Sequence, residues 1–229
     1  MHYDVLLWDV DGTLLDFEYS QRYSIQKCLE EIGVTPTEEM IQRYAIINDG
    51  WWKRLELGKV SKAELLVGRF IDLFSEYGIV CPDVELFRQH YQQYLGSVFA
   101  YVENSLEICQ MLQGKCRQFV VTNGVTATQM NKLKLSGFYD IMENIFISEQ
   151  IGAPKPQRAF FDKVLETIPE VNKNRILIIG DSLSSDMRGG NNAGIDTCWY
   201  NPFNEVNMTD VETRFDIRHL EEVIKILEG

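Results

Sequence analysis

The sequence is poor in basic residues. Its 229 residues include 22 Lys and Arg against 34 Asp and Glu, so the formal net charge is −12. Nucleic acid polymers and anionic membrane surfaces attract proteins through clustered Lys and Arg. We therefore expect neither a nucleic acid polymer nor a membrane as partner. A small anionic substrate held by a few local cations remains compatible with this charge.

Long hydrophobic runs and a disulfide pattern are also missing. No stretch approaches the run of about 18 apolar residues that would span a membrane. The first residues, from Met1 to Asp4, lack the basic region and apolar run of a signal peptide. The five cysteines are odd in number, scattered and without CxxC spacing, which is typical of reduced residues. We expect a cytoplasmic protein.

What is present is the composition of an ordinary globular protein, with 45% hydrophobic and 24% charged residues. Short apolar runs alternate with helical segments after residue 100, which predicts an α/β fold with a doubly wound, Rossmann-like parallel sheet. The predicted strands are Val5–Trp8, Gln118–Val121, Ile145–Ile147, Arg175–Ile179, Thr197–Tyr200 and Phe215–Ile217. The predicted helices between and after them are 105–113, 126–136, 159–167, 184–193 and 219–228.

Residues 17–99 differ from the rest, because helix signals dominate there and no clear strand appears. Thr35-Pro36-Thr37-Glu38 predicts a helix start with Thr35 as N-cap and Pro36 as first residue, and Ser61-Lys62-Ala63-Glu64 predicts a capping box. The preceding and following motifs, at Asp11 and Thr122, are 111 residues apart, roughly 80 more than one strand–helix–strand unit needs. We expect a core of residues 1–16 and 100–229 with an inserted helical cap, 17–99.

Polar residues follow the predicted strands at the points where the strands end. Ligands of doubly wound sheets bind beyond the carboxyl ends of the strands, so we expect a single site there. Four carboxylates would meet at this edge, and oxygen ligands without a His–Cys cluster suit Mg²⁺ better than zinc. The residues expected at the site are Asp9, Asp11 and Thr13, then Thr122-Asn123-Gly124, then Lys155, and finally Asp181 and Asp186.

These residues suggest phosphoryl transfer. Asp9, at the end of a buried strand, can attack phosphorus and form an aspartyl phosphate. Asp11 points to the same side of an extended chain and can protonate the leaving oxygen, then take a proton from the attacking water. Mg²⁺ and Lys155 would neutralise the phosphate oxygens, and the Thr122 hydroxyl with the Asn123 backbone N–H would hold them.

On these motifs the sequence resembles the haloacid dehalogenase-like (HAD) hydrolase superfamily. The family's four motifs match Asp9-Val10-Asp11-Gly12-Thr13, Thr122-Asn123-Gly124, Lys155-Pro156, and Gly180-Asp181-Ser182 with Asp186. The resemblance implies that Asp9 is the nucleophile and Asp11 the acid/base. It also implies that the side chains of Asp9 and Asp181 and the backbone carbonyl of Asp11 hold Mg²⁺, with Asp186 outside this shell or reached through water.

A narrower resemblance is carried by the insert. Asn48, Trp51-Trp52, Gly58-Lys59-Val60-Ser61 and Arg69-Phe70 look like the YjjG-type pyrimidine 5′-nucleotidase subgroup, and so does Ile147–Gly152. This implies a pyrimidine nucleoside monophosphate as substrate, of uridine or thymidine type rather than purine.

Four residues of the insert are candidates for selectivity: Asn48, Trp51, Trp52 and Tyr23. Aromatic faces stack on bases, and Asn48 could bond a pyrimidine edge or cap locally. Because neighbours on a helix are about 100° apart, Trp51 and Trp52 cannot both face one core.

Other functions fit parts of the pattern. A phosphatase of small sugar phosphates or a phosphomutase would carry the same four motifs and differ in the cap. The family's dehalogenases lack the second aspartate, so Asp11 argues against that activity. A phospho-accepting signal receiver also combines acids, Thr and Lys, but its Lys comes last, whereas Lys155 precedes Asp181. We expect a monomer or small homo-oligomer.

Overall fold

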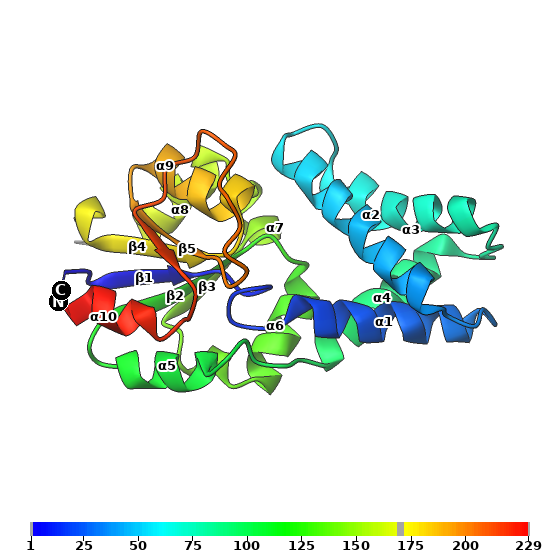
Figure 1. The fold of residues 1–229 in the computed structure, drawn as a ribbon, viewed down its shortest axis with the longest axis horizontal. Helices are drawn as coiled ribbons and strands as arrows, with labels where there is room; N and C mark the ends of the chain where they lie inside the picture. The colour runs from blue at the N-terminus through cyan, green and yellow to red at the C-terminus, as the bar shows by residue number, and fades with distance from the viewer. Residues whose placement is uncertain (1, 169–171, 229) are drawn as a thin grey trace. The chain divides into compact units, whose positions relative to one another are not determined.

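The computed structural model describes residues 2–168 and 172–228. The chain divides into two compact units, coloured along the chain in Figure 1: Met1–Asp16 with Ala100–Gly229, here called the core unit, and Phe17–Phe99, here called the helical unit. Residues near the two ends of the chain are hydrogen-bonded in the core unit, since the His2 N–H donates to the Leu227 carbonyl at 3.3 Å. Both ends of the described chain therefore lie together in the core unit.

The core unit is built on a parallel sheet. Within the described residues it has six strands in the order β3-β2-β1-β4-β5-β6, so β1 lies in the middle with β2 and β4 as neighbours. The strands are β1 (Val5–Trp8), β2 (Arg117–Thr122), β3 (Asn144–Ile147), β4 (Ile176–Gly180), β5 (Asp196–Tyr200) and β6 (Phe215–Ile217). The prediction of a doubly wound parallel sheet is confirmed.

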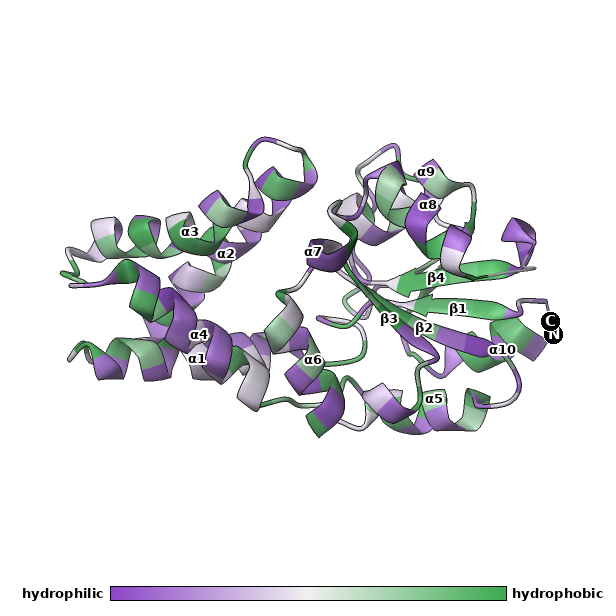
Figure 2. Ribbon diagram, turned by 180° about the vertical axis from the view of Figure 1, so that it is seen from behind, coloured by the Kyte–Doolittle hydropathy of each residue, from purple (hydrophilic) through white to green (hydrophobic). Residues whose placement is uncertain are grey.

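Helices cover both faces of this sheet. In Figures 1 and 2, α8 and α9 lie on one face, and α5, α6 and α10 lie on the other. The helices are α5 (Ser105–Leu112), α6 (Thr126–Leu135), α7 (Ser148–Ile151), α8 (Arg158–Thr167), α9 (Arg188–Ala193) and α10 (Glu222–Glu228). Short turns are the 3₁₀ segments η1 (Phe138–Asp140) and η2 (Lys173–Arg175) and the π-helical turn η3 (Leu183–Met187).

The strands of the sheet's centre are buried on both sides. Val5 and Leu7 of β1 pack with Phe160 and Phe161 of α8 in one continuous apolar cluster, while Trp8 turns to the other face, where its indole N–H donates to Gln118 at 3.2 Å. Figure 2 shows β1 and β4 as hydrophobic along their length. Because both faces are covered, these strands read as unbroken apolar runs in the sequence.

One predicted helix of the core unit is wrong in detail. Residues 184–193 do not form one helix, because the chain first makes the π-helical turn η3 and only then enters α9. In this turn the Ser182 hydroxyl caps the Ser185 N–H at 3.2 Å, and the Ser182 N–H donates to the Asp186 carboxylate at 3.2 Å. The wider turn directs the Asp186 side chain back towards the end of β4.

The helical unit consists of α1 (Phe17–Glu31), α2 (Glu38–Glu56), α3 (Lys62–Tyr77) and α4 (Val84–Ser97) among the described residues. Aromatic rings fill its centre. Tyr44 stacks on Phe70 with ring centroids 5.6 Å apart, and Tyr91 and Phe87 meet Phe70 edge-on at 5.1 Å. These rings come from α2, α3 and α4, and Ile25, Cys28 and Leu29 of α1 belong to the same apolar cluster, so the four helices share one core.

The helix starts of this unit test the capping predictions. Ser61 and Glu64 form the predicted capping box in both directions. The prediction that Thr35 caps α2 is wrong, because Thr37 is the N-cap and accepts the Met40 N–H at 3.2 Å, so Pro36 lies before the helix. Both threonines satisfy the sequence rule, and only the backbone path shows which one reaches a free N–H.

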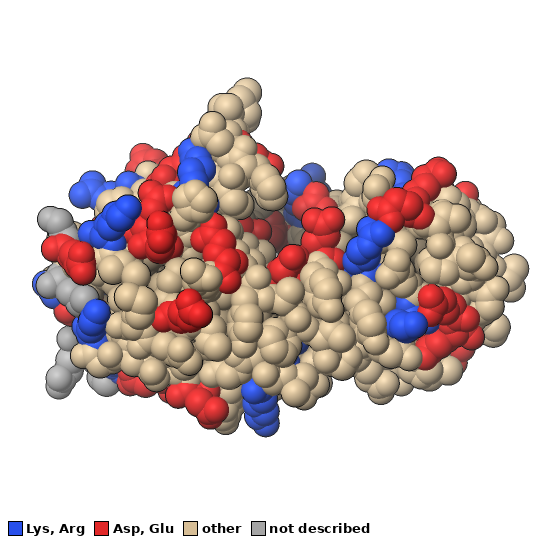
Figure 3. Space-filling model, turned by 60° about the horizontal axis from the view of Figure 1, so that its bottom comes forward, with Lys and Arg blue, Asp and Glu red and all other residues tan. Residues whose placement is uncertain are grey.

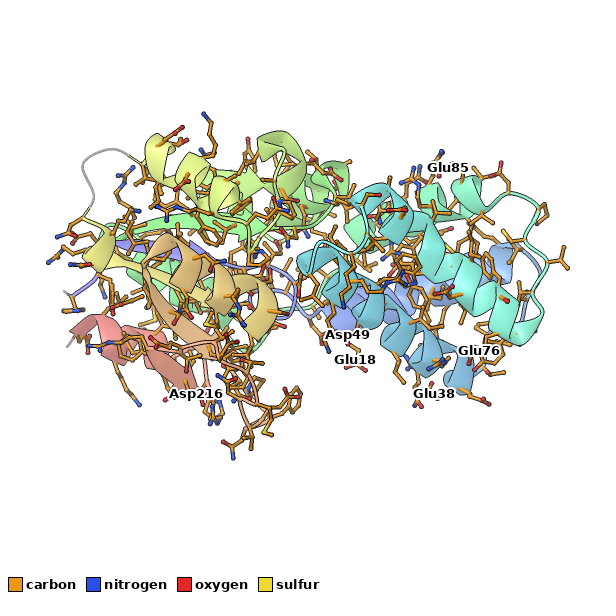
Figure 4. The ribbon with its side chains drawn as sticks, turned by 90° about the horizontal axis from the view of Figure 1, so that it is seen from above. Glu18, Glu38, Asp49, Glu76, Glu85 and Asp216 are labelled. Carbon is orange, nitrogen blue, oxygen red and sulfur yellow. The ribbon has the colours of Figure 1, made fainter. Side chains whose placement is uncertain are left out.

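The surface carries many acidic side chains, as the face in Figure 3 shows. Several of them pair with arginines in exposed positions: Glu38, Glu76 and Glu85, labelled in Figure 4, pair with Arg22, Arg43 and Arg88. Such exposed pairs add little stability. Among the described residues, no helix combines the length and hydrophobicity needed to span a membrane.

Candidate active site

The candidate site lies where β1, β2 and β4 end. Asp9 follows β1, Thr122 closes β2, and Asp181 follows β4. Because the three strands are parallel neighbours, their carboxyl ends share one edge of the sheet. The Asp9 N–H still donates to the Ile179 carbonyl at 2.9 Å, so the backbone of the first aspartate is fixed by the sheet itself.

Lys155 joins these strand ends. Its side chain is 1% exposed, and its ammonium lies 2.7 Å from Asp9 Oδ1, 2.6 Å from Asp186 Oδ1 and 2.8 Å from the Val121 carbonyl. All three donor positions of the ammonium are thus directed at oxygen. Such a fixed buried cation can neutralise negative charge that develops beside Asp9.

Asn123 fixes the backbone of Lys155. Its Nδ2 donates to the Lys155 carbonyl at 2.9 Å, and its Oδ1 accepts the Lys155 N–H at 2.8 Å. The Thr122 hydroxyl accepts the Gly124 N–H at 3.1 Å, which closes a tight turn after β2. The segment Thr122-Asn123-Gly124 therefore supports the lysine as well as presenting its own polar groups.

Three carboxylates cluster beside this lysine. Asp9, Asp181 and Asp186 each place an oxygen within 4.8 Å of the others. Gly12 makes the approach possible, because it has φ +93° and a Cβ there would lie 2.5 Å from Asp181 Oδ2. The Thr13 hydroxyl also reaches Asp181, at 3.4 Å.

The charges in this cluster are unbalanced. Burial raises the pKa of Asp9 although the ammonium of Lys155 opposes the shift. The pKa of Asp181 is raised by desolvation and by the charges of Asp9 and Asp186, even though the residue keeps some exposed surface. Burial works against the charged form of Lys155, but Asp186 and Asp9 hold its pKa above the usual value.

Three carboxylates facing one ammonium would leave an excess of negative charge. Repulsion of this kind is relieved by a bound cation, and a small set of oxygen donors suits Mg²⁺. The carboxylates of Asp9 and Asp181, with Asp186 beside them, therefore fit the metal expected from the sequence.

Asp11, the fourth carboxylate expected at this edge, is not one of the three clustered carboxylates, although its charge acts on Asp9. Its two carboxylate oxygens meet Lys132 and Gln129 of α6, each at 2.5 Å. Sequence analysis did not single out either residue. The available signal was their spacing of three on the helix that directly follows Thr122-Asn123-Gly124, since side chains three apart share one helix face.

The four selectivity candidates all lie in the helical unit. Asn48 is buried, with Nδ2 donating to Gln21 and Oδ1 accepting from Arg69, both at 2.7 Å. Trp51 packs against the aromatic core of that unit and donates to Asp72 at 2.7 Å.

Trp52 and Tyr23 are half-buried. Trp52 is not among the residues of the aromatic core cluster, and Tyr23 meets Tyr94 edge-on at 6.1 Å. Two adjacent tryptophans thus have different surroundings, as the helical spacing predicted.

Comparison with known proteins agrees with this geometry. A family model described as haloacid dehalogenase-like hydrolase matches residues 6–200. The chain therefore belongs to the haloacid dehalogenase-like hydrolase family, and it is an enzyme of that class.

Individual relatives extend over almost the whole chain. HAD-hydrolase YfnB of Bacillus subtilis is 37% identical over 98% of this chain and 95% of its own length. Pyrimidine 5′-nucleotidase PynA of Streptococcus pneumoniae is 36% identical over 100% and 96%. Pyrimidine 5′-nucleotidase YjjG of Escherichia coli is 27% identical over 99% of both chains. The resemblance to the haloacid dehalogenase-like hydrolases and to pyrimidine 5′-nucleotidases, predicted from the sequence, is confirmed.

A solved structure matches as well. The crystal structure of YfnB from Bacillus subtilis bound to magnesium superposes with a TM-score of 0.94, at 36% identity and over 100% of both chains. The predicted fold and the class of enzyme are thus supported by comparisons of both sequence and structure.

Proposed function

We propose that this protein is a Mg²⁺-dependent phosphomonoester hydrolase that works through an aspartyl phosphate on Asp9. The observation that carries the proposal is the position of Asp9. It is a nearly buried carboxylate at a strand end, 2.7 Å from a buried lysine and within 4.8 Å of two further carboxylates. This surrounding suits a nucleophile that must approach an anionic phosphate.

The metal would be held by the side chains of Asp9 and Asp181 and by the backbone carbonyl of Asp11, with Asp186 outside this shell. When bound, Mg²⁺ supplies positive charge that neutralises phosphate oxygens and the carboxylates around them. Asp186 accepts hydrogen bonds from Lys155 and from the Ser182 N–H. These contacts favour a role in orienting Lys155 rather than direct binding of the metal.

The chain's own residues would act in two steps. First, an Asp9 oxygen attacks phosphorus, the bond from phosphorus to the ester oxygen breaks, and Asp11 gives that oxygen a proton. Second, water attacks the aspartyl phosphate, Asp11 takes the water's proton, and inorganic phosphate leaves with the Asp9 carboxylate restored. Lys155 would neutralise the phosphate oxygens through its charge, and the Thr122 hydroxyl and the Asn123 backbone N–H would bind them in both steps.

The substrate we propose is a pyrimidine nucleoside 5′-monophosphate, of uridine or thymidine type. The core residues act on a phosphate group common to all monoesters, so selectivity must come from other parts of the chain. Two relatives that cover nearly the whole chain are named pyrimidine 5′-nucleotidases. Of the four candidates in the helical unit, we propose the half-buried Trp52 and Tyr23, because the Asn48 amide is bonded at both ends and Trp51 packs against the aromatic core.

A substrate panel tests the proposal. We expect kcat/KM for dUMP and dTMP to exceed kcat/KM for dAMP, dGMP and simple sugar phosphates, with p-nitrophenyl phosphate as a reference for the core chemistry. Equal rates for purines and pyrimidines would leave only the general phosphatase. A sugar phosphate as best substrate would favour the alternative phosphatase, and isomerisation of a sugar phosphate without phosphate release would favour a mutase.

A further inference from the structure

The Asp11 carboxylate is held by one helix on both of its oxygens. The Lys132 ammonium lies 2.5 Å from Oδ1, and Gln129 Nε2 donates to Oδ2 at 2.5 Å. Both residues come from α6, three positions apart, so their side chains leave the same helix face. The orientation of Asp11 is therefore fixed by two contacts that no motif of the sequence includes.

Lys132 is a buried cation, and the Asp11 carboxylate compensates its charge. The side chain is 0% exposed, although taking an ammonium out of water is costly unless a partner compensates. Lys134, two residues further along the same helix, is exposed. Lys132 is thus placed against a carboxylate in the interior, where an apolar residue would otherwise be the stable choice.

Gly124 leaves room for the second contact. A Cβ at Gly124 would lie 2.1 Å from Gln129 Nε2 and 2.5 Å from its Cγ. A larger residue at this position would displace the Gln129 side chain that reaches Asp11. The glycine of Thr122-Asn123-Gly124 is therefore linked to Asp11 through Gln129, beyond its place in the turn.

We propose that Lys132 and Gln129 are positioning residues that orient the Asp11 carboxyl group for protonating the leaving group; this inference rests on the function proposed above. In the first step the Asp9 oxygen-to-phosphorus bond forms while the ester bond breaks, and the departing oxygen takes its proton from Asp11. Lys132 and Gln129 touch neither phosphate nor leaving group. Each of them occupies one lone-pair position of an Asp11 oxygen, so the proton for the leaving group would be carried at a position that α6 leaves open, in a direction that the two contacts fix.

The leaving group decides how much this orientation matters. The 5′-alkoxide of a nucleotide is strongly basic and needs the proton as it departs. p-Nitrophenolate is a weak base and departs without it. Because kcat/KM covers the steps up to formation of the aspartyl phosphate, comparing it for the two esters isolates proton delivery from the later attack of water.

The experiment compares kcat/KM for dUMP and p-nitrophenyl phosphate in the wild type and in Lys132→Met. We expect a loss on the order of 10²-fold for dUMP and less than about threefold for p-nitrophenyl phosphate. Gln129→Leu, which removes no charge, should give the same pattern with a smaller loss. Lys132→Arg should recover part of the dUMP activity, and Lys134→Met, the same substitution on the exposed side of α6, should match the wild type.

Each outcome decides the inference. An equal loss for both esters, or no loss for either, in the folded Lys132 and Gln129 variants would overturn it, because a merely structural role cannot distinguish leaving groups. If Lys132→Met does not fold, as judged by circular dichroism, Gln129→Leu decides alone. A wild type without Mg²⁺-dependent hydrolysis of either ester would overturn the proposed function and this inference together. Failure of the inference alone would appear only in the variants, with a wild type that is active.

Discussion

Lys155 of the core unit and Arg69 of the helical unit are both buried cations, each 1% exposed. They differ in their partners, which are charged for Lys155 and neutral for Arg69. Lys155 meets two carboxylates and a carbonyl. Arg69 donates through Nη1 to the neutral amide of Asn48 at 2.7 Å and lies 4.8 Å from the rings of Phe70 and Tyr91. Within the part of the chain that the structure describes, its Nε and Nη2 have no hydrogen-bond partner.

The difference separates chemistry from packing. The core unit gathers more negative than positive charge around Lys155, which suits a bound cation. That cation and Lys155 together would then offset the charge of an incoming phosphate. In the helical unit, ring faces and one amide stabilise the guanidinium, and cation–π contacts of this kind contribute about 0.5–2 kcal/mol. Substitutions at the site of the core unit should therefore affect turnover, and substitutions in the helical unit should affect stability alone.

The largest expected effect is the loss of the nucleophile. Asp9→Asn should lower kcat by about 10⁴-fold or more, because no other residue can form the covalent intermediate. Intact-protein mass spectrometry after rapid acid quench should detect a phosphoryl adduct in the wild type and none in the variant. Asp140→Asn, an exposed aspartate of the same unit, is the control; near-normal turnover of Asp9→Asn would refute the covalent mechanism.

Removal of the metal should have a comparable effect on turnover. Excess EDTA should abolish hydrolysis and added Mg²⁺ should restore it, because three crowded carboxylates need a cation. Mg²⁺ should also raise the Tm of the wild type, since a ligand that binds only the native state stabilises it. Asp181→Asn should reduce this rise. Full activity in metal-free buffer would contradict the assignment of the cluster.

Loss of the acid/base should be less severe than loss of the nucleophile. Asp11→Asn keeps Asp9 but removes the group that gives and takes the proton, so kcat for dUMP should fall by about 10²- to 10⁴-fold. Steady-state kinetics on both variants give the ranking directly. A smaller kcat for Asp11→Asn than for Asp9→Asn would contradict the assignment of Asp9 as nucleophile and Asp11 as acid/base.

The two buried cations can be compared by one substitution. Lys155→Met leaves Asp9 and Asp186 without their partner, and removing one member of a buried ion pair costs about 3–5 kcal/mol. Arg69→Met removes a charge with no carboxylate partner, so the loss should stay below about 2 kcal/mol. Urea unfolding at neutral pH without metal measures both. Equal losses would mean that Arg69 has a counter-charge in solution.

The smallest effect concerns the start of α2 in the helical unit. Thr37→Ala should reduce the free energy of unfolding by about 1 kcal/mol, because the Met40 N–H loses its cap, and Thr35→Ala should change it by less than about 0.5 kcal/mol. Hydrolysis of p-nitrophenyl phosphate should be unchanged in both. The reverse order of stabilities would restore Thr35 as the cap.

Much of the fold could be predicted because its signals are local. β1 and β4 read as apolar runs since both of their faces are buried, and the capping box at Ser61 needs only four residues. The errors occurred where two residues met the same rule, as with Thr35 and Thr37, or where a turn widened to serve the site, as in residues 183–187. In both places the decisive contact lies in the three-dimensional path of the backbone.

The sequence by itself determined the class of chemistry. Asp9, Asp11, Lys155 and Asp181 are of the residue types from which phosphoryl transfer can be predicted. Their order between strands is sufficient to predict one shared sheet edge, because parallel strands bring their carboxyl ends together.

Only the tertiary structure decided how those side chains are held. The contacts from Lys132 and Gln129 to Asp11, from Asn123 to Lys155, and from Arg69 to Asn48 each join residues between 21 and 121 positions apart. The strength of these contacts depends on burial and on the distance and direction between the two groups. Packing of the whole unit sets these quantities, and no local sequence pattern encodes them.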